Sequence, residues 1–178
     1  MLKRMPWLAT LVLLPSLATG QADGTTLARF KGTQGGTLVV KEANLVHFMS
    51  CFADADFKKT NAVSFTTTLM GSPSQPLFEF ILRYEPRKKI HLFSVRTYYL
   101  NSSGEFGPAI KDLPVTFTEG DGFSGKGTAK LKGRDLDVTV AITQVEPQHH
   151  EWEVTFGARD AIAFQYKFDT KKALSDKE

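Results

Sequence analysis

The chain has 178 residues, of which 42% are hydrophobic and 11% aromatic, and its 22 basic and 19 acidic residues give a net charge of +3. This length and composition are typical of one globular domain with a well-packed core. A net charge so close to zero provides little long-range attraction for nucleic acid or an anionic membrane, so neither is expected as a partner.

Residues 1–20 have the three parts of a secretory signal. Lys3 and Arg4 form the positive start, an apolar run follows, and Ala18-Thr19-Gly20 provides a small-residue cleavage pattern before Gln21. The apolar run is shorter than the roughly 20 residues that a membrane-spanning helix needs, and no later stretch is long enough. Without Lys3 and Arg4, 20 basic residues remain against 19 acidic ones, so the net charge falls to +1. We expect a signal peptide at residues 1–20 and a periplasmic or extracellular location.

Cys51 is the single cysteine of the chain. It lies too far from the predicted cleavage site to be a lipid-modified cysteine, and it has no partner for an internal disulfide. We therefore expect one domain at residues 21–170 that is stabilised by its core alone. Residues 171–178 are mostly charged and polar, which predicts a C-terminal tail.

Apolar and polar residues alternate with period two in several segments, the pattern of strands with one face in a core. The clearest example is 136–143, where Leu, Val and Ile alternate with Asp, Thr and Ala. The pattern recurs at 63–69, 78–85, 151–156 and 162–168, with Gly, Pro, Asn and Asp between many of the segments.

Three N-terminal segments complete the expected strand set: Thr25–Lys31, Gly36–Lys41 and possibly Leu45–Phe52. Gly32–Gly36 lacks the lysine and the following helix of a phosphate-binding loop, so it is predicted as a hairpin turn. Glu42–Ala55 also fits a helical stripe, but its neighbours favour a strand. The total is about nine to eleven antiparallel strands and at most one short helix.

The fold class is therefore all-β. We expect an antiparallel two-sheet β-sandwich, because the large aromatic residues on the inner faces would leave little room for a cavity. A closed or flattened β-barrel is the alternative, since a sheet of this many strands folds over or closes on itself.

The segment Ile90–Leu100 predicts a candidate ligand site. One of its faces carries Ser94, Arg96 and Tyr98 among apolar residues, and a buried arginine needs an anionic or polar partner. With Tyr84 from the preceding strand, these residues could hold the polar end of an apolar ligand. In the competing interpretation this face is the outer one and Arg96 lies in solvent.

A second candidate surface is the segment Phe123–Lys132. Lys126, Lys130 and Lys132 share one face, which could contact a protein partner in the envelope or could simply be solvated. Glycines alternate on the other face and predict a close approach of another backbone.

No catalytic, cofactor or metal motif stands out. His149 and His150 suggest a metal, but alternate residues of one strand lie about 7 Å apart and converge poorly on one ion. Cys51 has an apolar context, which predicts an inert thiol. Four acids could belong to an unrecognised hydrolase site, although their spacing is ordinary: Asp54, Asp56, Asp112 and Glu119.

We therefore predict an exported, non-catalytic β domain of the bacterial envelope that binds a small apolar or amphiphilic ligand, without a cofactor or metal. An envelope protein-interaction or structural module is the alternative, and a hydrolase is the third hypothesis.

Overall fold

The computed structural model describes residues 26–27, 30, 32–42, 45–56, 61–69, 72–98, 100, 106–118, 122–131, 133–158 and 161–172. The predicted signal peptide, Lys132, Glu119 and residues 173–178 lie outside these ranges. For residues 47–56 only the backbone is described, so the side chains of Cys51, Asp54 and Asp56 are not.

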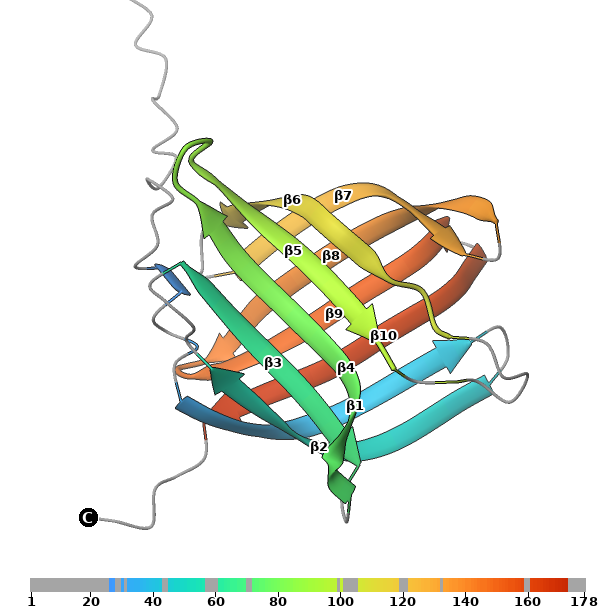
Figure 1. Cartoon of the computed structure of the whole chain (residues 1–178), viewed down its shortest axis with the longest axis horizontal. Helices are drawn as coiled ribbons and strands as arrows, with labels where there is room; N and C mark the ends of the chain where they lie inside the picture. The colour runs from blue at the N-terminus through green and yellow to red at the C-terminus, as the bar shows by residue number, and fades with distance from the viewer. Residues whose placement is uncertain are drawn as a thin grey trace, which may run out of the picture.

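Ten β-strands make up almost all of the described chain (Figure 1). Their bounds are β1 Gly32–Glu42, β2 Leu45–Asp56, β3 Ala62–Leu69, β4 Ser72–Glu85, β5 Ile90–Thr97, β6 Ile110–Thr118, β7 Gly122–Leu131, β8 Arg134–Glu146, β9 His149–Ala158 and β10 Ala161–Lys172.

The strands form one closed antiparallel barrel in which each strand pairs with its neighbours in sequence. β1 closes the ring by pairing with β10, with Leu38 opposite Phe168 and Val40 opposite Tyr166. The prediction of an all-β antiparallel fold is confirmed, and of the two predicted architectures the structure has the barrel. No helix in the described residues is long and apolar enough to cross a membrane.

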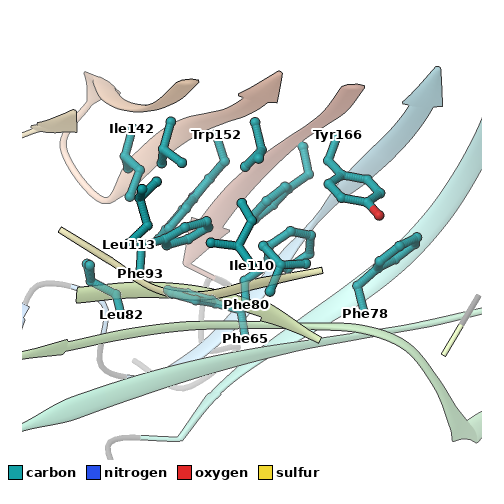
Figure 2. Packing of buried hydrophobic residues seen from close by; sticks show 14 of the residues in the cluster. Phe65, Phe78, Phe80, Leu82, Phe93, Ile110, Leu113, Ile142, Trp152 and Tyr166 are labelled. Atoms are coloured by element: carbon teal, nitrogen blue, oxygen red, sulfur yellow. The ribbon is translucent and has the colours of Figure 1, made fainter. Parts of the chain in front are cut away.

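Aromatic side chains fill the interior of the barrel (Figure 2). Rings from opposite walls meet, with centroid distances of 4.3 Å between Phe80 and Phe168 and 4.8 Å between Phe65 and Trp152. The preference for a sandwich followed from the size of these side chains. Large rings fill this closed barrel equally well, so their size did not distinguish the two architectures.

Three local predictions have different outcomes. The described part of Glu42–Ala55 is extended, as favoured: Glu42 ends β1, and the residues from Leu45 onward belong to β2. Gly32–Gly36 is not a hairpin turn but the start of β1, where the Asp169 carbonyl leaves no room for a Cβ on Gly36. Thr25–Lys31 is not a strand in its described part, since residues 26–27 and 30 are in helical turns.

The glycines of β7 confirm the predicted close approach. A Cβ on Gly125 would lie 2.5 Å from the carbonyl oxygen of Pro114 and 2.7 Å from Val115 Cγ1, and one on Gly127 would meet the Leu113 side chain. These glycines therefore allow β6 to pack tightly over the inner face of β7.

Because neighbouring strands are antiparallel, all even-numbered strands begin at one end of the barrel. We call this the rim end; it includes the β5–β6 connection, of which residues 98, 100 and 106–109 are described. The opposite end, with residues 26–30 and the β4–β5 and β8–β9 turns, is the plug end. Figure 1 shows the β4–β5 turn and the β5–β6 connection on opposite sides of the molecule.

Candidate functional site

The regular pairing of β5 and β6 is interrupted near the rim end. Phe93 lies opposite Leu113, but Val95 lies opposite Ile110, so β6 has one extra residue in this interval. Asp112 lies in the interval with a φ of 54°, a left-handed conformation uncommon outside glycine. This arrangement is a β-bulge, which bends β6 away from its neighbour.

A groove of about 540 Å³ lies on the outer face of β4, β5 and β6 beside this bulge. Its side chains combine positive charge, one carboxylate, one hydroxyl and apolar surface. The residues that line it include Ile81, Arg83, Ser94, Arg96, Lys111 and Asp112.

Polar contacts hold the Asp112 side of the groove in place. Arg83 Nη2 lies 3.2 Å from Asp112 Oδ1, and Arg83 Nη1 lies 3.3 Å from Glu85 Oε2. Ser94 Oγ accepts a hydrogen bond from the backbone N–H of Asp112 at 2.9 Å and donates one to its Oδ1 at 3.3 Å. Arg83 and Ser94 therefore fix the conformation of the bulge.

The cations on the other side of the groove are more accessible. Arg96 has a side chain that is 63% exposed, and its Nη1 donates a 2.9 Å hydrogen bond to Glu79 Oε2. Glu79 in turn accepts a hydrogen bond from Ser64 Oγ at 3.0 Å. Lys111 is exposed, and no ion pair joins it to an acid in the described ranges. These two side chains can reach an anion in the groove.

The structure brings together two of the four predicted ligand residues. Ser94 and Arg96 both line the groove, whereas Tyr98 lies on the same face beyond the end of β5 and is 48% exposed. Tyr84 points inward at the plug end, with its ring centroid 5.1 Å from that of His91. Its position on β4 is in phase with the inward Phe80, so it cannot share a site with Ser94. Arg96 lies on the outer face, as in the competing interpretation.

The predicted lysine face is only partly described. Lys126 and Lys130 are exposed on the outer face of β7, opposite Thr139 and Asp135 of β8, and Lys132 lies outside the described residues. The acids of β8 border these lysines, which weakens any local positive potential.

The two adjacent histidines of β9 point to opposite sides of the sheet. His149 Nε2 lies 3.7 Å from Asp169 Oδ2 on the outer side, and the ring of the buried His150 lies 4.6 Å from Phe30 in the interior. Within the described ranges, no three His, Cys, Asp or Glu side chains are grouped so that they could hold a metal ion. The histidine pair therefore does not converge on one site.

A second hollow, of about 300 Å³, lies on the outer face of β8, β9, β10 and β1. Its charged groups are largely engaged with one another. Lys167 Nζ lies 3.2 Å from Glu153 Oε2, and Asp169 Oδ1 accepts hydrogen bonds from the backbone N–H and Oγ1 of Thr37 at 2.9 and 2.7 Å. This hollow is smaller than the groove at β4–β6 and has less accessible positive charge.

Sequence reasoning missed Arg83 and Lys111 as groove residues and considered Asp112 only as a possible catalytic acid. The alternation of β4 predicted that Arg83 points outward. The bulge that brings Asp112 beside it could not be predicted, because no glycine marks the position of positive φ. No family model matches the sequence, and no curated protein matches it. The groove at β4–β6 is therefore the feature of the molecule that points to a function.

Proposed function

We propose that the protein is an exported, non-catalytic binding domain that holds a small amphiphilic ligand in the groove at β4–β6. The observation that carries this proposal is the bulge at Asp112, which opens a groove with accessible Arg96 and Lys111 beside the apolar surface of Ile81. An anionic head group would accept hydrogen bonds from Arg96, and an apolar tail would cover Ile81.

The filled interior supports an external site. Phe78 and Phe80 of β4 contact Tyr166 of β10 at centroid distances of 4.8 and 6.1 Å (Figure 2). Rings that meet across the barrel occupy the space in which a carrier protein would hold its ligand. A ligand is therefore better accommodated in the groove than between the walls.

The state of the groove carboxylate supports a binding role over a catalytic one. Asp112 is engaged by Arg83 and by the hydroxyl and backbone contacts with Ser94. These contacts give the carboxylate a structural part in holding the bulge, and the bulge is what a binding groove at this position needs. The predicted signal peptide at residues 1–20 is the basis for proposing export to the periplasm or the medium.

Binding of octyl phosphate to the processed protein, measured by calorimetry and native mass spectrometry, tests this function. We expect R96A to weaken binding by about 10- to 100-fold, since a hydrogen bond to a charged group contributes roughly 1.5–3 kcal/mol. Octanol, which lacks the anionic group, should bind weakly to both proteins.

The matched control is R87A, which removes an exposed cation on the β4–β5 turn, outside the groove. It should bind octyl phosphate like the wild type. The proposal fails if the wild type does not bind octyl phosphate, or if R96A and R87A bind it equally well.

A further inference from the structure

Large apolar side chains are exposed mainly at one end of the barrel. Among the described residues, Val46, Tyr98, Leu100 and Phe106 at the rim end have exposed fractions of 48, 48, 50 and 61%. At the plug end, only Val145 in the described ranges belongs to this group, with 43%. Single exposed apolar residues are ordinary, but three of these four belong to the β5–β6 connection, which makes this connection a candidate interaction surface.

The β5–β6 connection holds three of these side chains outward in a defined arrangement. Leu100 pairs with Phe106 in an isolated antiparallel bridge. Tyr166 Oη donates a buried 2.8 Å hydrogen bond to the Pro108 carbonyl, and a Cβ on Gly107 would lie 2.7 Å from the same Oη. The connection is therefore anchored on its inner side.

Tyr98 lies between this apolar surface and the groove. Tyr98 follows Arg96 on the same face, and its backbone N–H donates a 2.8 Å hydrogen bond to the Leu77 carbonyl. Lys111, on the other wall of the groove, lies five residues after Phe106. Apolar and cationic side chains thus lie at the same end of the barrel, a combination suited to the boundary between lipid head groups and acyl chains.

We propose that the rim end docks on a lipid membrane with anionic head groups, and that the groove takes its amphiphilic ligand from that membrane. This inference rests on the proposed function, for which it names the source of the ligand. Tyr98, Leu100 and Phe106 enter the interfacial region, while Arg96 and Lys111 contact head-group phosphates.

The composition of the surface favours a lipid membrane over a partner protein or a second copy. Exposed apolar side chains lie at the same end of the barrel as the two accessible cations of the groove, which matches an anionic membrane. Because the expected net charge is only +1, apolar contact supplies the main attraction and the cations add locally.

Sedimentation of the processed protein with vesicles tests the docking. We expect binding to phosphatidylglycerol vesicles to weaken by roughly tenfold or more in the double variant L100S and F106S, because two apolar contacts are lost. The matched control is V145S, an exposed apolar residue at the plug end, which should bind as the wild type does.

The charge contribution is measured with a second pair of variants. K111Q should weaken binding to phosphatidylglycerol by about fivefold and leave binding to phosphatidylcholine unchanged, while R87Q at the plug end should change neither. Docking is overturned if the wild type does not sediment with either vesicle, or if the double variant binds as V145S does.

Octyl phosphate separates failure of the docking from failure of the proposed function. The double variant should still bind octyl phosphate like the wild type, since its substitutions lie outside the groove. Vesicle binding by a protein that does not bind octyl phosphate would support the docking and reject the groove as a ligand site. A dimer that dissociates in the double variant would assign the surface to a second copy and overturn the proposal.

Discussion

The two ends of the barrel use apolar side chains in opposite ways. At the plug end Leu27 and Phe30 are fully buried, and the Phe30 ring lies 5.4 Å from Trp152 and 5.6 Å from Phe65. At the rim end, Phe106 of the β5–β6 connection is 61% exposed. Burial at the plug end therefore contributes to stability, whereas exposure at the rim end leaves apolar surface for binding.

The difference has a structural cause in each connecting segment. At the plug end, Thr26 Oγ1 lies 3.1 Å from Nε2 of the buried His91, and Phe30 enters the space between the walls. At the rim end, the Tyr166 side chain already lies against Gly107 and Pro108 on the inner side, and the neighbouring Phe106 is exposed. An apolar residue in a connection is thus buried or exposed according to the room left by the wall residues.

The largest expected effect comes from truncating the Phe30 side chain at the plug end. F30A should lower the free energy of unfolding by about 3–5 kcal/mol, the usual cost of truncating a buried phenylalanine. Urea denaturation measures this change. F106A provides the comparison at the rim end and should change stability by less than about 0.5 kcal/mol. Equal effects of the two substitutions would show that the ends do not differ as described.

A smaller effect is expected from the closure of the rim end. Y166F removes the hydrogen bond to the buried Pro108 carbonyl and should destabilise the protein by about 1–2 kcal/mol. Hydrogen exchange adds a local measurement: amides of residues 98–110 should lose protection more than those around Phe30. Unchanged protection of this segment would mean that Tyr166 does not anchor it.

Much of the fold could be predicted from the alternation of apolar and polar residues alone. In β8, Val138, Val140 and Ile142 are buried and Asp137 and Thr139 are exposed, as their alternation predicted. Closure could not be predicted in this way, because it depends on pairing between β1 and β10 at opposite ends of the chain. The local pattern fixes which face is inward but not which strand lies beside it.

The candidate site was predictable only in part, for the same reason. The mixed face of β5 identified Ser94 and Arg96, which line the groove. Asp112 joins them through a bulge. Its positive φ could not be predicted, because the position is occupied by an aspartate and not by the glycine that usually marks such a conformation. Tyr84 was grouped with them as a residue of the preceding strand, although its position in the alternation of β4 directs it inward.

The smallest expected effect comes from the β4–β5 turn at the plug end, where Arg87, Lys88 and Lys89 are exposed. Lys89 has a φ of 52°, a conformation that costs a non-glycine residue roughly 1–2 kcal/mol. K89G should therefore raise the free energy of unfolding by about 0.5–1 kcal/mol, because the greater freedom of glycine in the unfolded chain offsets part of the gain. K88G, at a position without positive φ, should not stabilise the protein.

K89G also removes a cation from the plug end. Because the rim end is the proposed membrane contact, binding of K89G to phosphatidylglycerol vesicles should match that of the wild type. Weaker binding would assign membrane contact to the plug end and reverse the comparison between the two ends.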